Sequence, residues 1–329
     1  MKKSLMTLGV LALFVLMAYG QEKKFALYSV AFYNMENLFD TIHDEGKNDY
    51  EYLPNGTNQW NTMKYKAKLK NMSEILSLLS TDKLPNDRVL EDILKQPALA
   101  DRGYQYVHYE GEDQRGVDCA FFYNPKLFEL TNSKLVPYVY INDTIHKTRG
   151  FLIASGNIAG EKMHFIVNHW PSRAAASPAR ERAGEQVRAI KDSLLREDSA
   201  AKIVIMGDMN DDPMDKSMAV ALGAKRKPAD VGPTDLYNPW WDTLKKGYGT
   251  LMYKGKWNLF DQIVFTGNLL GTDRSTLKFY KHEIFRRDFM FQKEGKYKGY
   301  PKRTQAGGVW LNGYSDHLPT IIYLIKEMK

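Results

Sequence analysis

Short runs of apolar, β-branched and aromatic residues recur along most of this chain of 329 residues. Such runs predict buried β-strands, and some of them are separated by segments with helical periodicity. Strands in direct succession, mixed with strands joined by helices, favour stacked sheets with helices outside over a doubly wound or barrel fold. The predicted strands are Phe25 to Tyr33, Val117 to Tyr123, Leu135 to Ile141, Phe151 to Asn157, Met163 to Val167, Lys202 to Met206, Leu259 to Phe265 and Thr320 to Ile325.

Two segments predict long helices. From Pro178 to Glu197 apolar residues repeat at helical spacing, with Ser177 as the expected N-cap and proline at the first helical position. The second helix is predicted from Lys64 to Leu79. The chain has no internal repeat and no low-complexity linker, so we expect residues 21–329 to form one domain.

Residues 1–20 predict a signal peptide. Lys2 and Lys3 precede an apolar run from Leu5 to Ala18, and small residues suit cleavage after Gly20. The alternative is an uncleaved anchor, although the run is shorter than the ~20 residues of a spanning helix. We therefore expect an exported, periplasmic or extracellular protein with no stable membrane span after cleavage.

Composition narrows the class of protein further. A hydrophobic content of 43% with 26% charged residues is typical of a compact water-soluble protein and excludes a disordered chain. Cys119 is the only cysteine, which excludes an internal disulfide and a thiolate zinc cluster. The segment from Arg286 to Arg303 holds seven basic residues against two acids, interleaved with aromatic rings. It predicts a positively charged wall for an anionic substrate, with an ordinary solvated loop as the alternative.

Four clusters of carboxylate, amide and imidazole residues follow strand-like runs. Asn34 and Glu36 are two apart, so in an extended chain they point to one face and can offer oxygens to one hard cation. Asp208 and Asn210 share this spacing. Each cluster alone is also typical of an Asx turn that ties a loop. The clusters are Asn34 to Asp40, Asn168 to Arg173, Gly207 to Asp212 and Ser315 to Pro319, with Asp261 and Gln262 at the end of another apolar run.

The order and flanks of these clusters resemble the endonuclease/exonuclease/phosphatase superfamily, whose fold is similar to that of deoxyribonuclease I. The resemblance covers essentially the whole chain after the signal peptide. Arg115 to Asp118 and Gly255 to Ile263 are similar to segments of its bacterial secreted or periplasmic branch. The resemblance implies a four-layered α/β/β/α sandwich that hydrolyses a phosphate ester with Mg²⁺, or Mn²⁺, as cofactor.

The resemblance also implies a role for each site residue. Asn34, Glu36 and Asp316 would hold the metal, and Asp208 would orient or deprotonate the attacking water. His317, paired with Asp261, would contact the phosphate, and Asn210 would hold one of its oxygens. His169 would stabilise the leaving group, and Arg115 and Arg173 would clamp the phosphate. A phosphodiester is anionic, so donors and a cation must offset charge as it builds while a carboxylate activates water.

One connection departs from the family pattern. Family members normally carry a buried strand that ends in a glutamate, the principal metal ligand, between the first two helices. Here the connection from Ser80 to Arg88 contains only Leu84 as an apolar residue, so it cannot be a buried strand. The sequence therefore predicts a deletion of this strand and its glutamate, with a weaker metal site as the consequence.

Taken together, these features predict a metal-dependent phosphoesterase that acts on a phosphodiester in a nuclease-like reaction, with nucleic acid as a candidate substrate. Two alternatives stay open: a phosphatase of small or lipid-linked phosphates, and a catalytically impaired protein that binds phosphate or nucleic acid. The chain has no Gly-x-Ser-x-Gly, His-Glu-x-x-His, P-loop or Cys-x-x-Cys signature, which argues against those other chemistries. The sequence does not define the oligomeric state.

Overall fold

The computed structural model describes residues 23–79, 88–141, 143 and 145–328; the predicted signal peptide and the predicted deletion site at 80–87 lie outside them. The helices are α1 (Thr62–Leu79), α2 (Arg88–Leu94), α3 (Ser177–Glu197) and α4 (Trp241–Lys245), with a π-helical turn at Ser217–Ala221. The strands are β1 (Phe25–Phe32), β2 (Gln105–His108), β3 (Ala120–Tyr123), β4 (Phe128–Val136), β5 (Phe151–Ile158), β6 (Glu161–His169), β7 (Lys202–Asp208), β8 (Ala224–Lys225), β9 (Leu236–Tyr237), β10 (Leu251–Tyr253), β11 (Lys256–Asn258), β12 (Asp261–Thr266), β13 (Lys278–Ile284), β14 (Gln305–Ala306), β15 (Val309–Trp310) and β16 (Thr320–Glu327).

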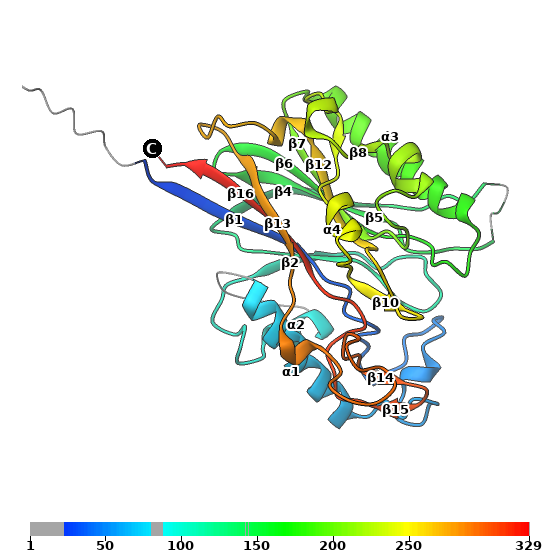
Figure 1. The fold of residues 1–329 in the computed structure, drawn as a ribbon. Helices are drawn as coiled ribbons and strands as arrows, with labels where there is room; N and C mark the ends of the chain where they lie inside the picture. Colours follow the sequence, from blue (N-terminus) through cyan, green and yellow to red (C-terminus); the bar gives the residue numbers. More distant parts are fainter. Residues whose placement is uncertain (1–22, 80–87, 142, 144, 329) are drawn as a thin grey trace, which may run out of the picture.

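Two principal sheets form the centre of the molecule (Figure 1). The larger has seven strands in the order β4-β5-β6-β7-β12-β9-β8, and the smaller has three in the order β1-β16-β13. Most neighbours are antiparallel, whereas β6 and β7 are parallel and are joined by α3. A crossover helix is the usual connection between parallel neighbours, because a hairpin cannot join them.

Alternation along the strands gives each sheet two apolar faces. In β7, Val204 and Met206 face the smaller sheet, whereas Ile203 and Ile205 pack in the cluster beneath α3. In β16, Ile322 belongs to the core between the sheets. Successive side chains of a strand point to opposite faces, so both faces must be covered.

Helices cover the two outer faces. Val187 of α3 packs on the outer face of the larger sheet, and Ile75 of α1 packs with Ile321 on the outer face of the smaller sheet. The order of layers is α3, larger sheet, smaller sheet, α1, which confirms the predicted α/β/β/α sandwich (Figure 1). No helix within the described ranges is long and apolar enough to cross a membrane.

Two local predictions are wrong. The strand expected from Leu135 to Ile141 lies upstream as β4 and ends at Val136, because Pro137 has no N–H for the ladder. The N-cap of α3 is Ala176, not Ser177, and no side chain caps it. Pro178 is therefore the second helical residue and not the first, and its missing N–H costs little because the first four N–H groups of a helix have no intrahelical partner.

Candidate active site

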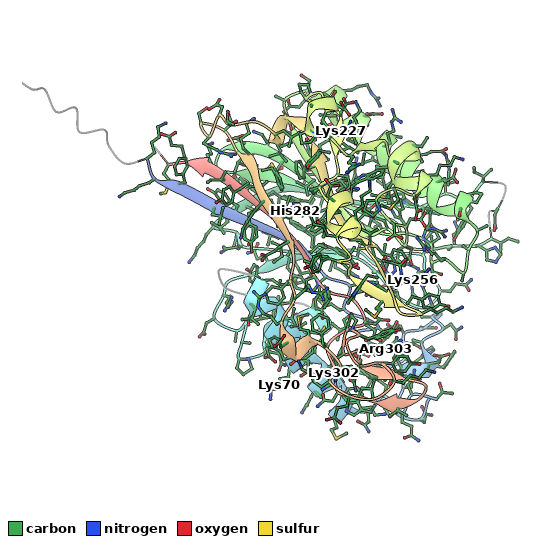
Figure 2. All side chains as sticks on the ribbon, viewed as in Figure 1. Lys70, Lys227, Lys256, His282, Lys302 and Arg303 are labelled. Carbon is green, nitrogen blue, oxygen red and sulfur yellow. The ribbon has the colours of Figure 1, made fainter. Side chains whose placement is uncertain are left out.

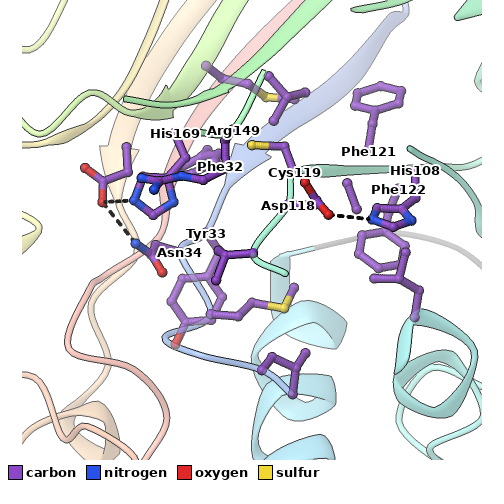
Figure 3. Close-up of a pocket in the computed structure, with 18 of the residues that line it drawn as sticks. Phe32, Tyr33, Asn34, His108, Asp118, Cys119, Phe121, Phe122, Arg149 and His169 are labelled. Atoms are coloured by element: carbon purple, nitrogen blue, oxygen red, sulfur yellow. Dashed lines mark hydrogen bonds and ion pairs between the residues drawn. The ribbon is translucent and has the colours of Figure 1, made fainter. Parts of the chain in front are cut away.

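A cavity of about 1150 Å³ borders the carboxyl ends of β6 and β7. Figure 3 shows Asn34, Arg149 and His169 close together on one side of it. It brings together eight of the predicted site residues in its lining: Asn34, Glu36, Arg115, His169, Asp208, Asn210, Asp316 and His317. Asp261 and Arg173 are outside this lining, with Asp261 directly behind His317.

Strand register places His169, Asp208 and Asp261 side by side. His169 of β6 is opposite Asp208 of β7 in the parallel pair, and Asp208 is opposite Asp261 in the antiparallel pair of β7 and β12. Gly207 permits the close approach of β6, because a Cβ there would lie 2.2 Å from the carbonyl oxygen of Asn168. Three segments far apart in sequence therefore present polar side chains at one end of the larger sheet.

His317 completes this group from the segment before β16. Its Nδ1 lies 2.7 Å from Oδ2 of Asp261 and its Nε2 lies 3.8 Å from Oδ2 of Asp208, and all three side chains are buried. Burial by itself lowers the pKa of His317, but the two carboxylates outweigh it and raise the pKa to about 10. At neutral pH His317 is therefore a cation with an N–H on both ring nitrogens.

His169 has the opposite character. Its Nε2 lies 3.5 Å from Oδ2 of Asp208. Burial, and then the positive charge of Arg149, lower the pKa of His169 to about 3 in spite of the attraction of Asp208. A neutral imidazole can donate one hydrogen bond and accept another, so His169 brings no positive charge to a leaving group.

Asn34 links the carboxylate of Asp208 to the first cluster. Its Nδ2 donates to Oδ2 of Asp208 at 3.0 Å, and its Oδ1 accepts the backbone N–H of Glu36 at 3.0 Å. The expectation that Asn34 and Glu36 share one face of an extended chain is wrong, because β1 ends at Phe32 and Glu36 has a φ of 49°. The two side chains are held near one another by an Asx turn instead.

Glu36 is buried, and each of its carboxylate oxygens accepts a hydrogen bond. Its Oε1 accepts from Nε of Arg303 at 2.7 Å, and its Oε2 accepts from the backbone N–H of Thr304 at 2.8 Å. Arg303 also lies 3.1 Å from Oδ2 of Asp316, so one guanidinium bridges the two carboxylates predicted as metal ligands. Burial and the charge of Asp316 raise the pKa of Glu36 although Lys68 and Arg303 oppose them.

Asn210 is held at the rim of the cavity. It has a φ of 51°, a conformation that asparagine tolerates better than most residues. Its backbone N–H donates to Oδ1 of Asp208 at 2.9 Å, and its Nδ2 donates to the carbonyl of Trp170 at 3.0 Å. The second hydrogen on Nδ2 is the one that can reach a phosphate oxygen.

The two arginines predicted as phosphate clamps have carboxylate partners. Arg115 makes a bidentate pair with Asp113 at 3.1 Å for both bonds. Arg173 is 2.8 Å from Asp215 and stacks on Phe260 away from the cavity lining. The geometry therefore gives Arg173 a structural position outside the site and leaves Arg115 at the cavity with its charge already paired.

Arg149 is a site cation that sequence reasoning missed. It is buried, lines the cavity beside His169, and donates to Asp113 and to the carbonyl of Trp170, each at 3.1 Å. Its Nε has no hydrogen-bond partner within the described part of the chain. Arg149 is the residue directly before Gly150 and β5 and belongs to no motif, so only its position in the fold identifies it.

The basic stretch from Arg286 to Arg303 does not form a wall of this cavity. None of its described residues contributes to the cavity lining. Arg286 is half-buried with its guanidinium over the rings of Trp257 and Phe291, at 4.8 and 4.9 Å from their centroids. Phe291, one of the interleaved aromatic residues, therefore packs against Arg286 and is not open to stack on a base.

Two sets of residues can be compared as a site for a divalent cation. The ligand atoms of Asp208, Asp261 and His317 lie within 4.8 Å of one another. A protonated imidazole cannot coordinate a metal, and the pKa of His317 makes it protonated at neutral pH. Glu36, Asp316 and Asn34 offer only oxygen donors with two negative charges, the donor set that suits a hard cation such as Mg²⁺.

A second group of possible ligands lies at the other side of the cavity. Ligand atoms of His108, Glu110 and Asp118 lie within 4.8 Å of one another, and Figure 3 shows His108 facing Asp118. The ammonium of Lys47 is 2.6 Å from Oε1 of Glu110. Because a lysine already supplies positive charge to these carboxylates, the group is explained as an ion-pair network.

Comparisons with known proteins agree with the architecture. Residues 29–326 match the profile of the Endonuclease/Exonuclease/phosphatase family.

Solved structures share the fold at low sequence identity. An endonuclease/exonuclease/phosphatase family protein from Bacteroides thetaiotaomicron has a TM-score of 0.56 at 15% identity, covering 93% of this chain and 97% of that chain. A mannosyl-6-phosphatase from B. thetaiotaomicron has a TM-score of 0.54 at 15% identity, covering 90% and 98%. D. rerio TDP2 complexed with a single-strand DNA product has a TM-score of 0.50 at 14% identity, covering 80% and 94%. A search of curated proteins finds no match. At these identities the solved structures establish the shared fold.

Proposed function

This chain belongs to the Endonuclease/Exonuclease/phosphatase family, and we propose that it hydrolyses a phosphate ester, with a phosphodiester as substrate and Mg²⁺ or Mn²⁺ as cofactor. The observation that carries the proposal is the buried group of Asp208, His317 and Asp261 at the cavity. In this group, the carboxylate of Asp208 can orient or deprotonate water, and the cationic ring of His317 can donate a hydrogen bond to a phosphate. Nucleic acid is the polyanion we place first among substrates.

The proposed division of roles follows from the protonation states. Asp208 accepts hydrogen bonds from Asn34 and from the backbone of Asn210, which fix its carboxylate for orienting or deprotonating the attacking water. His169 is neutral and 3.5 Å away, so its ring can hold the same water without competing as a cation. Attack forms a bond from the water oxygen to phosphorus and breaks the bond from phosphorus to the leaving ester oxygen. One water proton goes to the carboxylate of Asp208, and the leaving oxygen takes a proton from a donor of the site such as His317.

His317 and Arg149 face the negative charge of the substrate in this proposal. His317 is fixed by Asp261 through Nδ1, so its Nε2–H points away from Asp261 towards Asp208 and the cavity and can donate to a phosphate or leaving oxygen. Arg149 adds a fixed positive charge beside His169. A divalent cation held by Glu36 and Asp316, with Asn34, would supply further positive charge to offset the charge that builds on the phosphate.

A second function is favoured by one specific observation. Arg303 already pairs with both Glu36 and Asp316, which lowers the demand of this carboxylate pair for a metal ion. A protein with this arrangement could bind a phosphate or nucleic acid at Arg149 and His317 without turnover. This alternative predicts substrate binding with no hydrolysis in the presence of Mg²⁺.

The deciding experiment is an assay of the purified protein on plasmid DNA, RNA, a generic phosphodiester and a phosphomonoester, with and without chelator. Hydrolysis that chelator abolishes supports the enzyme, and the preferred substrate separates nuclease from phosphatase.

Asp208→Asn should lower turnover by at least ~10²-fold, the usual effect of losing a general base. Asp215→Asn is the matched control, since Asp215 pairs with Arg173 outside the cavity lining. Near-normal turnover of Asp208→Asn would contradict this site.

We also propose that the protein is exported, periplasmic or extracellular, on the basis of the charged start and apolar run within residues 1–20. Mass spectrometry of the protein from its native host should find Gln21 at the mature N-terminus. Soluble cytoplasmic material that retains Met1 would contradict the proposal.

A further inference from the structure

The guanidinium of Arg303 lies where the two acidic ligands of a hard-cation site meet. Its Nη2 is 2.6 Å from Oε1 of Glu36 and 3.1 Å from Oδ2 of Asp316, and its Nε is 2.7 Å from the same Glu36 oxygen. The Nε contact is a charge-assisted hydrogen bond of the strong class, and the two Nη2 contacts are ion pairs. The two carboxylates are thus joined through a single cation that belongs to the chain.

The backbone around Arg303 is fixed by the hairpin of β14 and β15. The carbonyl of Lys302 accepts from the N–H of Tyr314 at 2.7 Å, and the carbonyl of Thr304 accepts from the N–H of Leu311 at 3.0 Å. Gly313 makes this approach possible, because a Cβ there would lie 2.2 Å from the carbonyl oxygen of Arg303. The hairpin therefore aims the guanidinium at Glu36, while its side chain stays 41% exposed and has room to leave.

Lys68 adds a second internal cation behind the pair. It is fully buried on α1, and its Nζ donates to Oγ1 of Thr304 at 2.5 Å and to the carbonyl of Tyr314 at 2.6 Å. Glu36 and Asp316 are the carboxylates whose charge acts most strongly on it. Two negative and two positive side chains balance here, so a divalent ion that joined them without displacing a cation would leave an excess of two positive charges.

We propose that Arg303 is the resident cation of the Glu36 and Asp316 pair, and that a divalent cation binds there only by displacing its guanidinium. The proposal rests on the proposed function solely in taking these two carboxylates as the cation ligands. It makes Arg303 a positioning residue that sets the affinity for metal. A guanidinium that leaves Glu36 remains tethered to the hairpin, where it can reach an anion near the metal.

The test is direct titration of the purified full chain with Mn²⁺, followed by electron paramagnetic resonance or calorimetry rather than by turnover. Arg303→Gln should bind Mn²⁺ at least tenfold more tightly than the unaltered chain, because the ion no longer competes with a guanidinium. Lys302→Gln is the matched control: it removes the same charge from the neighbouring residue, which Figure 2 labels beside Arg303, but leaves the contacts with Glu36 in place. It should change the affinity by less than threefold.

Thermal unfolding provides a second measurement that does not depend on activity. Without metal, Arg303→Gln should melt at a lower temperature than the unaltered chain, and Mn²⁺ should raise its melting temperature by more than it raises that of the unaltered chain. Arg303→Lys, which keeps the charge but loses the fork that spans both carboxylates, should fall between them. Equal or weaker Mn²⁺ binding by Arg303→Gln, including no binding by either protein, would overturn the proposal. Absence of hydrolysis on every substrate would contradict the proposed function alone, since these readouts measure only binding.

Discussion

At the scale of single residues, the charge of His317 couples stability to pH. The pKa of His317 is about 10 in the folded protein, whereas a histidine in an unfolded chain titrates near ~6.5. Between these two values the folded state holds a proton that the unfolded state releases. The contribution of His317 to stability is therefore complete below about pH 6.5 and is lost as pH rises towards 10.

Urea unfolding at pH 6 and pH 9 measures this dependence. The unaltered chain should lose more stability between these pH values than His317→Gln, which has no proton to release. Lys68 makes stability rise with pH instead, because burial lowers its pKa to about 8. This contribution is the same in both proteins and therefore cancels in the comparison. An equal pH dependence of the two proteins would show that Asp261 and Asp208 do not hold His317 as a cation.

Arg149 provides the residue-scale prediction for substrate binding. A hydrogen bond from a buried cation to a charged group contributes about 1.5–3 kcal/mol, or roughly 10- to 100-fold in affinity. Arg149→Met should raise KM for a phosphodiester by that factor, measured by initial rates over a range of substrate concentrations. Arg182→Gln on α3 removes a similar charge from a residue outside the cavity lining and should leave KM unchanged. An unchanged KM for Arg149→Met would mean that this arginine only supports Asp113 and Trp170.

The same residues show what sequence patterns can and cannot reveal about a site. His169 and Asp208 end strand-like runs, and the strand register places them beside Asp261, so these positions together with the family resemblance were sufficient to find them. Arg303 contacts Glu36 across 267 positions of sequence, and Arg149 contacts Asp113 across 36. Contacts of this kind depend on the packing of loops, which no local periodicity encodes.

At the scale of elements, the packing of α3 on the π-helical turn limits what the helix tolerates. Gly184 lies in α3, and a Cβ there would be 2.5 Å from the carbonyl oxygen of Ser217. Replacing an interior helical glycine with alanine normally gains about 1 kcal/mol. Gly184→Ala should instead lower the melting temperature, because backbone atoms must move apart.

Ala189→Gly calibrates the expected effect of helix propensity at an exposed position of the same helix. It should lower the melting temperature through backbone entropy alone. If Gly184→Ala raised the melting temperature by the amount that Ala189→Gly lowers it, the contact with Ser217 would not limit this helix.

Elements also differ in how well their sequences identify them. β7 is predicted because each of its residues is buried, so the run is apolar throughout apart from its ends. β13 carries Lys278, Lys281 and Glu283 on a sheet edge, and its mixed composition gives no strand signal although it pairs with β16 along most of its length. The position of β4 depends on its pairing with β5, and a pattern read locally placed it too late in the chain.

At the scale of the whole molecule, the cavity lies between β1, an edge strand of the smaller sheet, and the two-stranded sheet of β2 and β3. β1 pairs with β16 on one side, and among the described residues no strand pairs with its other edge. The cavity is lined by consecutive residues 28–32 of β1 and 119–123 around β3. Because side chains of a strand alternate between faces, consecutive lining residues mean that the edges of both strands border the space. Unpaired edges of this kind cost stability unless water or another group bonds them.

The prediction from the sequence that a strand is deleted can be tested at this cavity. A version of the protein with a β-strand and a terminal glutamate inserted between Pro85 and Asn86 should melt at a higher temperature, because the new strand can pair with backbone groups on both edges. It should also bind Mg²⁺ more tightly, since an added carboxylate increases the affinity of an oxygen-ligand site, and each tenfold gain corresponds to about 1.4 kcal/mol. Calorimetric titration and thermal melts measure the two effects. A glycine-serine insert of equal length is the control for loop length and should produce neither. If the strand insert and the control behave alike, the two edges do not form a site for a strand, and Glu36 and Asp316 must hold the cation without a further carboxylate.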